Sequence, residues 1–417
     1  MVPLRYIQEF LTVPDNYPTI QAAVDAANEG DTIMVRARAQ AYEENVLVNK
    51  TVRLFGEGFP VIDGGHSIGF YGAPTVIVIA DNVTVNGFVI LHTGWLNEAD
   101  FGVALWSCSG CNISGNIIRF NRVGVEMDTG DNNHIISNNR IEQVGCGIDC
   151  CGSGLHIRGN TISSSGGGII VWSPSNSLMN NTVVGNGRGI DLHANETTLR
   201  DNNMTGNQYN FGVYENLLHR LINDIDASNT VNGKPVYYWI NQSDRRVPAD
   251  AGYVAIINST NITIEGINLE KNSQGLFLAY STNCTIRNCN ISNNIWGVCI
   301  EASSNNTIYH NSFINNTFHT AQISAFWDPI QLPPNIWDSG YPSGGNYWSS
   351  YSGSDLHRGP YQNETGSDGI GDTPHLIDDD NCDNYPLMSP YWYWISPTPG
   401  DTDRDGDVDS KDLFTLA

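Results

Sequence analysis

A four-residue motif, glycine followed by an apolar, a variable and a second apolar residue, recurs along most of this chain. Neighbouring copies mostly lie 21 to 23 residues apart. The copies are GVAL (102–105), GVEM (124–127), GIDC (147–150), GIIV (168–171), GIDL (189–192), GLFL (275–278) and GVCI (297–300). Self-similarity at this period, with short alternating strands, indicates coils that stack strand on strand. The sequence therefore predicts an all-β fold, a right-handed parallel β-helix with coils of about 22 residues.

Equivalent positions of successive coils should form ladders along the axis. The first apolar residue of each copy is predicted to point inward; these residues are Val103, Val125, Ile148, Ile169 and Ile190. A second set places asparagine at one corner: Asn116, Asn139, Asn160, Asn181 and Asn202. Asparagine tolerates the left-handed backbone of a tight turn, and stacked asparagine side chains can bond to one another along the axis.

The repeat divides the chain into segments. We expect an N-terminal cap at 1–48, the β-helix at 49–325 with an irregular insertion at 208–257, an aromatic and Asp-rich C-terminal cap at 326–395, a linker at 396–400 and an acidic loop at 401–417. Residues 18–31 predict a short amphipathic helix that ends at Gly30. Asn232 and Gly233 predict a hairpin turn.

Composition excludes several classes of protein. The 417 residues carry 20 basic and 44 acidic side chains, a net charge of −24, and only four lysines. Nucleic-acid binding needs a basic surface, so it is not expected. No apolar run is long enough to span a membrane, and the content of Gly, Asn and Thr disfavours a helical bundle.

Several features indicate an extracellular or cell-surface location. The first sixteen residues lack the pattern of a signal peptide, so we expect the numbering to begin after processing. There are fourteen Asn-x-Ser/Thr triplets, and the predicted glycosylation sites are Asn82, Asn112, Asn195, Asn261, Asn283 and Asn305. An Asn- and Thr-rich repeat also produces such triplets by composition alone. Nine cysteines leave at least one unpaired within the chain.

Three segments carry a resemblance to a known family. They are the repeats, DIDASNTVNGKPVYYW (224–239), and GNYWSSYSGSD (345–355) followed by GSDGIGDTPHLID (366–378). Together they resemble the NosD-like family of CASH-domain β-helices, which is common in archaeal secreted and surface proteins. The resemblance covers about residues 17–390 and implies a surface protein that handles carbohydrate. The founding member helps to mature a copper enzyme in the periplasm, so a copper-handling accessory role is an alternative implied by the family.

Copper in that alternative would need soft ligands. The candidates are the Cys-x-x-Cys pair Cys108 and Cys111, together with Cys146 and Cys150. The same cysteines can also form disulfides or stack as small hydrophobic side chains. No cluster of histidines accompanies them in the sequence.

The C-terminal loop predicts a calcium site. Asp401, Asp403, Asp405, Asp407, Asp409 and Asp412 place oxygen donors at the spacing of a calcium-binding loop, with Gly406 at the sharp turn. The loop resembles one half of a type I dockerin. A dockerin needs two halves, so a cohesin partner is not expected. A second calcium site is predicted at Asp355, Asp368 and Asp372.

The outward positions of five coils predict a saccharide-binding groove. They are Ala104 and Trp106, Glu126 and Asp128, Asp149 and Cys151, Ile170 and Trp172, and Asp191 and His193. Indole faces stack on sugar rings and carboxylates bond to hydroxyl groups, so the predicted binding residues are Trp106, Asp128, Trp172 and Asp191. The candidates for catalysis are Glu126, Asp149, Asp191, Arg188 and His193.

These observations predict a calcium-stabilised surface β-helix protein with a structural, adhesive or carbohydrate-binding role. The alternative is a polysaccharide-active hydrolase, lyase or epimerase that uses the groove. The expected partner is a polysaccharide or glycan surface, and self-assembly into filaments or layers is a further possibility.

Overall fold

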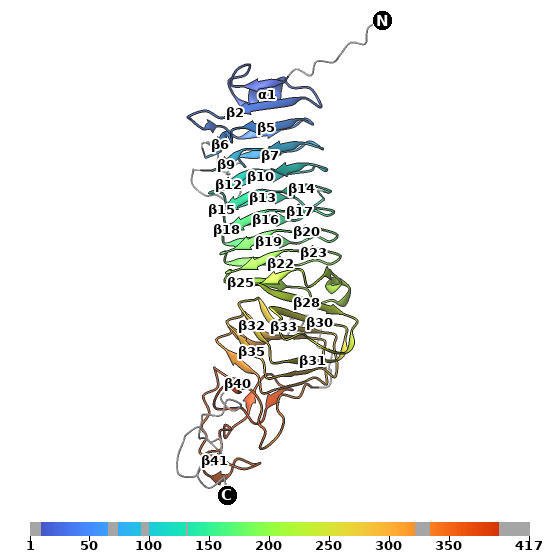
Figure 1. The fold of residues 1–417 in the computed structure, drawn as a ribbon, viewed down its shortest axis with the longest axis vertical. Coiled ribbons are helices and arrows are strands. Elements are labelled where there is room, and N and C mark those ends of the chain that lie inside the picture. Colours follow the sequence, from blue (N-terminus) through green and yellow to red (C-terminus); the bar gives the residue numbers. More distant parts are fainter. Residues whose placement is uncertain (1–9, 66–73, 93–99, 131, 322–333, 392–417) are drawn as a thin grey trace. The chain divides into compact units, whose positions relative to one another are not determined.

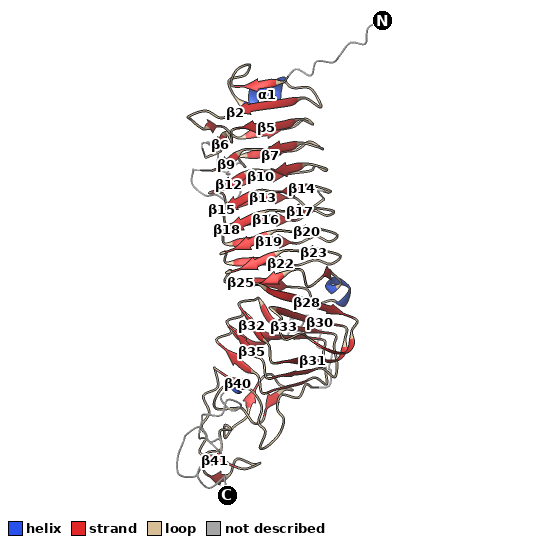
Figure 2. Ribbon diagram, viewed as in Figure 1, coloured by secondary structure: helices blue, strands red, loops and turns tan. Residues whose placement is uncertain are grey.

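The computed structural model describes residues 10–65, 74–92, 100–130, 132–321 and 334–391. The chain divides into two compact units, the first formed by 1–215 with 219–233 and the second by 216–218 with 234–417. In each unit nearly all regular structure is β-strand, and the strands of successive coils pair in parallel (Figures 1 and 2). The predicted all-β parallel β-helix is therefore confirmed.

The first unit has three columns of strands, so each coil contributes up to three short strands. The first column contains β1 (Leu11–Val13), β2 (Thr32–Arg36), β5 (Arg53–Glu57), β8 (Thr84–Asn86), β11 (Asn112–Ser114), β14 (Ile135–Ser137), β17 (His156–Arg158), β20 (Ser177–Met179), β23 (Thr198–Arg200) and β26 (Asp224–Ile225). The second contains β4 (Val46–Val48), β7 (Val76–Val78), β10 (Phe101–Leu105), β13 (Val123–Met127), β16 (Cys146–Cys150), β19 (Gly167–Val171), β22 (Arg188–Leu192) and β25 (Tyr209–Val213). The third contains β3 (Tyr42–Glu43), β6 (Val61–Asp63), β9 (Val89–Leu91), β12 (Ile117–Arg119), β15 (Arg140–Glu142), β18 (Thr161–Ser163), β21 (Thr182–Val184), β24 (Asn203–Thr205) and β27 (Thr230–Val231).

The second unit repeats the arrangement. Its columns are β28 (Lys234–Ile240), β30 (Tyr253–Ile257), β33 (Gln274–Ala279), β36 (Trp296–Glu301) and β39 (Phe318–Ala321); β29 (Ser243–Arg246), β31 (Thr260–Glu265), β34 (Thr285–Arg287) and β37 (Thr307–Tyr309); and β32 (Asn268–Glu270), β35 (Asn290–Ser292), β38 (Ser312–Ile314) and β40 (Tyr347–Trp348). Two short antiparallel pairs follow: β41 (His357–Arg358) with β42 (Glu364–Thr365), and β43 (His375–Leu376) with β44 (Cys382–Asp383). The 3-10 helix η1 is Leu218–Leu221.

The apolar ladder of the first unit lies where the motif predicts it. The register pairs the first apolar residues of the five copies in β10, β13, β16, β19 and β22, namely Val103, Val125, Ile148, Ile169 and Ile190. All five are fully buried. The glycine of the motif is required by close packing, because a Cβ on Gly124 would lie 2.5 Å from the carbonyl oxygen of Gly147.

The asparagine ladder differs from the expectation in one respect. Asn139 donates from Nδ2 to Oδ1 of Asn160, and Asn160 does the same to Asn181, so the predicted bonding along the axis is present. The left-handed conformation, however, belongs to the preceding residues Asn138 and Gly159. The ladder residues themselves are buried, because their side chains satisfy backbone groups inside the corner.

The N-terminal helix is shorter than predicted. Helix α1 (Ile20–Ala26) begins after Thr19, whose side chain accepts a hydrogen bond from the backbone of Ala22. It ends at Ala26 rather than at Gly30, because the N–H of Ala27 closes the last turn and Ala27 itself is extended. The helix buries Ile20, Ala23 and Val24.

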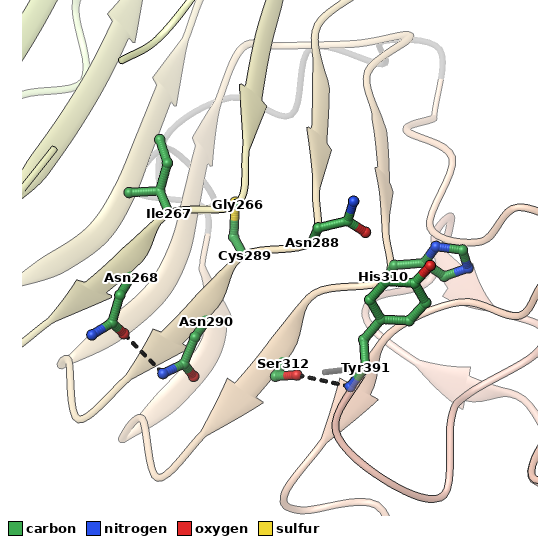
Figure 3. Close-up of a pocket in the computed structure, with 9 residues that line it drawn as sticks. All are labelled: Gly266, Ile267, Asn268, Asn288, Cys289, Asn290, His310, Ser312 and Tyr391. Atoms are coloured by element: carbon green, nitrogen blue, oxygen red, sulfur yellow. Dashed lines mark hydrogen bonds between the residues drawn. The ribbon is translucent and has the colours of Figure 1, made fainter. Parts of the chain in front are cut away.

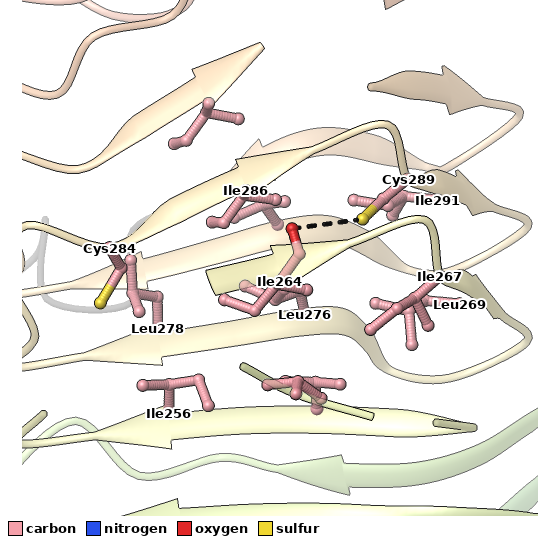
Figure 4. Close-up of a cluster of buried hydrophobic side chains, with 14 of the residues drawn as sticks. Ile256, Ile264, Ile267, Leu269, Leu276, Leu278, Cys284, Ile286, Cys289 and Ile291 are labelled. Atoms are coloured by element: carbon pink, nitrogen blue, oxygen red, sulfur yellow. Dashed lines mark hydrogen bonds between the residues drawn. The ribbon is translucent and has the colours of Figure 1, made fainter. Parts of the chain in front are cut away.

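The core of the second unit is a continuous apolar cluster (Figure 4). Ile264, Leu276 and Ile286 come from three strands and are fully buried. At the C-terminal end of the unit, Trp348 stacks on Phe313 with ring centroids 4.4 Å apart. Aromatic packing therefore closes this end of the core.

Candidate functional site

Two columns of side chains stand side by side on the β10–β22 strands of the first unit. The register aligns Glu126 with Asp149, Asp149 with Ile170, and Ile170 with Asp191. We call Glu126, Asp149 and Asp191 the acid column. The residue after each strand forms the outer column, which contains Trp106, Asp128, Cys151, Trp172, His193 and Tyr214. The two columns together are the acid–aromatic face.

Exposure varies along this face. Trp172 is 47% exposed, Asp128 is exposed, and Glu126 and Asp149 are half-buried. Ala104 and Asp191 share the register position of Glu126 and Asp149, as predicted, but they are not exposed, because Ala104 is fully buried and the Asp191 side chain is only 3% exposed. Asp191 is therefore a support of the face rather than a surface ligand.

Each of the two indoles is fixed by a carboxylate of the acid column. Trp106 donates from Nε1 to Oε2 of Glu126 at 2.7 Å. Trp172 donates from Nε1 to Oδ1 of Asp149 at 2.7 Å. Burial raises the pKa of Asp149, and the bond from Trp172 offsets part of that rise.

Arg188 joins the two columns at the other end of the face. Its Nη1 donates to Oδ2 of Asp191 at 3.0 Å and to the hydroxyl of Tyr214 at 2.6 Å. Burial raises the pKa of Asp191, against the opposing effect of the Arg188 guanidinium. Arg188 is itself partly exposed, so it covers Asp191 from solvent.

Three rings of the outer column stack on one another. The centroids of Trp172 and His193 are 4.1 Å apart, and those of His193 and Tyr214 are 4.5 Å apart. Burial, with the nearby charge of Arg188, lowers the pKa of His193 to about 4. His193 is therefore neutral at pH 7 and can stack without the cost of burying a charge.

Tyr214 is a member of the face that the sequence analysis missed. The motif is absent from its coil, where Asn210 replaces the glycine. Counting 21 residues on from His193 finds it, and the register of β22 with β25 confirms the position.

The predicted calcium ligands fall in two places. Residues 401–412 lie outside the described part of the chain. Asp355 accepts bonds from the backbone N–H groups of Asp368 and Gly369, and Asp372 accepts bonds from those of Leu356 and His357. These carboxylates hold turns of the C-terminal segment. Among the described residues, Asp355, Asp368 and Asp372 do not combine into a group of three that would hold an ion.

The predicted glycosylation sites also differ in exposure. Asn82, Asn261, Asn283 and Asn305 are exposed at corners, whereas the two others, Asn112 and Asn195, are half-buried.

A small hollow of about 210 Å³ lies in the second unit (Figure 3). The rings of His310 and Tyr391 stack at 4.0 Å on one side of it. On the other side, Nδ2 of Asn290 donates to Oδ1 of Asn268 at 2.8 Å. None of the predicted binding or catalytic residues lines this hollow.

The fold and this face define a parallel β-helix protein with a polar aromatic surface. The sequence profile of NosD, described as "Periplasmic copper-binding protein (NosD)", matches residues 24–243 and 241–353. The chain belongs to the NosD family. No helix among the described residues is long and apolar enough to cross a membrane.

Three individual proteins are also similar to this chain. A cell surface glycoprotein of Methanothermus fervidus is 30% identical over 109 residues, which cover 26% of this chain and 17% of the relative. Among solved structures, the Streptococcus pneumoniae surface adhesin PfbA is 14% identical, with a TM-score of 0.43 over 74% of this chain and 91% of the adhesin. The A-module of the Azotobacter vinelandii mannuronan C-5 epimerase AlgE6 is also 14% identical, with a TM-score of 0.39 over 76% and 92%.

The family description names copper, so the cysteines can be tested as its ligands. The Sγ atoms of Cys108 and Cys111 are 3.9 Å apart and buried, and the hydrogen bond between the two side chains lowers the pKa of Cys111 to about 5. Burial raises the pKa of Cys146 to about 12. Within the described ranges, no three His, Cys, Asp or Glu side chains form a group that could hold a metal ion. The described residues therefore do not fit a copper centre with three protein ligands.

Proposed function

We propose that this protein is a secreted or cell-surface β-helix protein that binds carbohydrate on its acid–aromatic face. The location is supported by the surface relative and by the periplasmic family description. The binding role is supported by one observation above all, which is that Trp172 is exposed while its ring plane is held by Asp149 and His193.

The geometry suggests where a sugar ring would lie. His193 covers one face of the Trp172 indole, so we expect a sugar ring to stack on the opposite face, which is on the side of Cys151 and Asp128. A pyranose that stacks there would place its hydroxyl groups beside Asp128 and the acid column. Indole stacking combined with a few polar acceptors is the usual make-up of a small-ligand site.

Binding to neutral and acidic polysaccharides, measured by calorimetry with native protein and with Trp172→Ala, tests this proposal. Loss of a central indole should weaken binding about 30-fold, or ~2 kcal/mol. Tyr361→Ala is the matched control, because Tyr361 is an 83% exposed aromatic residue of the second unit. Unchanged affinity in Trp172→Ala, or equal losses in both variants, would contradict the proposal.

A polysaccharide-active enzyme is the second candidate. Glu126 and Asp149 are register partners, and one strand spacing of about 4.8 Å is near the separation of the two carboxylates in retaining glycosidases. The raised pKa of Asp149 suits a proton donor. Release of reducing or unsaturated ends from a polysaccharide panel, abolished in Asp149→Asn and kept in Asp244→Asn, would support catalysis. Asp244 is an exposed carboxylate of the second unit. Binding without product would exclude it.

A further inference from the structure

Many of the Asn-x-Ser/Thr triplets follow from the geometry of the coil corners. Eight of the fourteen have their asparagine at a positive φ: Asn82, Asn180, Asn241, Asn258, Asn261, Asn283, Asn305 and Asn315. Asparagine adopts this conformation more readily than other residues with a side chain. At Asn283 and Asn305 the threonine two residues later opens the next strand. The corner conformation and the following strand can therefore place Asn and Thr two residues apart without any selection for glycosylation. The exposure of the asparagine then decides which triplets can be glycosylated.

Three of these asparagines form a column on adjacent coils of the second unit. Bridges align Thr260 with Thr282 and Thr282 with Ser304, so Asn261, Asn283 and Asn305 occupy the same corner. Their φ angles are 54°, 55° and 57°, and all three are exposed. The threonines of the three triplets, Thr263, Thr285 and Thr307, are also register partners. The second unit thus presents one attachment geometry three times in succession.

The side-chain amides of this column differ from that of Asn290, a triplet asparagine in a strand of the same unit. Nδ2 of Asn261 bonds to the exposed Asp244, and among the described residues no hydrogen bond involves the side chain of Asn283 or of Asn305. In contrast, Asn290 is half-buried and its Nδ2 is already used by Asn268. All three asparagines of the column are therefore exposed, and the side-chain amides of Asn283 and Asn305 have no hydrogen-bond partner among the described residues.

We propose that the corner column Asn261–Asn283–Asn305 is an N-glycan attachment stripe in which neighbouring coils compete for occupancy. In the reaction, Nδ2 of an asparagine attacks C1 of an oligosaccharide carried on a lipid phosphate. The Nδ2–C1 bond forms, the bond from C1 to the phosphate oxygen breaks, Nδ2 loses one proton and the lipid phosphate leaves. No oxidant or metal redox step is involved.

Competition follows from the strand spacing. Adjacent coils are about 4.8 Å apart, and a pyranose ring with its equatorial substituents is broader than that distance. Two glycans on Asn283 and Asn305 would therefore crowd each other in the folded protein. Asn82 in the first unit has no such neighbour, because the next coil has Gly110 at the equivalent corner. A Cβ there would lie 2.5 Å from Oδ1 of Asn82.

The test is to secrete the full chain from a host that N-glycosylates proteins and to count glycans per molecule. Cleavage after lysine and before aspartate leaves Asn283 and Asn305 on one peptide, 272–327. Mass spectrometry with fragmentation then shows whether each molecule carries a glycan at Asn283, at Asn305, or at both. We expect one or the other, and full occupancy at Asn82.

Thr285→Val removes one triplet while leaving Asn283 in its corner conformation. In this variant the glycan occupancy at Asn305 should nearly double, and the occupancy at Asn82 should not change. The matched control is Thr84→Val, which should abolish glycosylation at Asn82 and leave the occupancy of the column unchanged. Peptides that carry both glycans, or no rise at Asn305 in Thr285→Val, would overturn the competition. A column that stays bare while Asn82 or a control glycoprotein is modified would overturn the proposal as a whole.

Discussion

Trp172 donates a hydrogen bond from its indole Nε1 to Oδ1 of Asp149, one coil before it, whereas Trp106 bonds to Glu126, one coil after it. Both indoles are thus held toward the two coils that lie between them. Those two coils contain only Asp128 and Cys151 in the outer column. The acid column therefore positions the rings as well as providing acceptors.

Asp149→Ala should weaken saccharide binding, because it frees the Trp172 ring and leaves the indole N–H without its acceptor. A hydrogen bond to a charged group contributes about 1.5–3 kcal/mol, so we expect a loss of roughly tenfold or more. Asp149→Asn keeps an oxygen acceptor and should retain most of the affinity. Calorimetry measures the saccharide affinity, and tryptophan fluorescence anisotropy measures the freedom of the Trp172 ring. Equal losses of affinity in Asp149→Ala and Asp149→Asn would contradict a positioning role.

Asn160→Ala should destabilise the first unit. The Asn160 side chain donates to the carbonyl of Ile136 and accepts from the backbone N–H of Asn139, and all of these atoms are buried. Unsatisfied buried groups cost about 1–3 kcal/mol each, so the free energy of unfolding should fall by about 3 kcal/mol. The urea midpoint measures it. The exposed Asn203→Ala should change the free energy by no more than about 0.5 kcal/mol, and a similar shift in both would refute the ladder's contribution.

Asp383 should make stability depend on pH. It is buried and accepts bonds from the N–H of Asn346 and Nε1 of Trp348, yet burial raises its pKa to about 7. Since the folded state holds this proton more tightly than the unfolded state, its contribution is fully present below the unfolded pKa of about 3.9 and is lost as the pH rises through about 7.

Asp383→Asn should remove that dependence, so the difference in Tm between variant and native protein should grow in the variant's favour from pH 5 to pH 8. Calorimetric scans at several pH values measure it. Asp379→Asn changes an exposed carboxylate of the same segment and should keep the native slope. A constant difference between Asp383→Asn and native protein would contradict the assignment.

We propose that the full chain takes up calcium through its C-terminal loop. The double variant Asp401→Ala, Asp405→Ala removes two ligand positions of that loop and should lose the uptake of one ion seen by calorimetry in native protein. Asp378 is an exposed carboxylate of the C-terminal cap, so Asp378→Ala should take up this ion as native protein does. Identical uptake by native protein and the double variant would refute calcium binding at 401–412.

The repeat alone predicts the position of the inner ladder, because a period of about 22 residues with strict alternation leaves only one side of each strand for the core. Val103 and Ile190 are buried as expected for this reason. The same arithmetic places Glu126, Asp149 and Asp191 in one column. The repeat does not predict where α1 ends or which residues of the asparagine corner are left-handed, since both depend on which backbone groups find hydrogen-bond partners locally.

The sequence by itself determined the coil, its period, the inner ladder and the alignment of the acidic positions, because these follow from spacing along the chain. Only the tertiary structure decided that Asp191 is buried under Arg188, that Tyr214 completes a ring stack with His193, and that the two indoles are tied to carboxylates of neighbouring coils. Apart from the contact of Asp191 with Arg188, which is three residues away, those properties depend on contacts between residues about 20 or more positions apart. In all of them the length and direction of each side chain, rather than its place in the repeat, determine its partner.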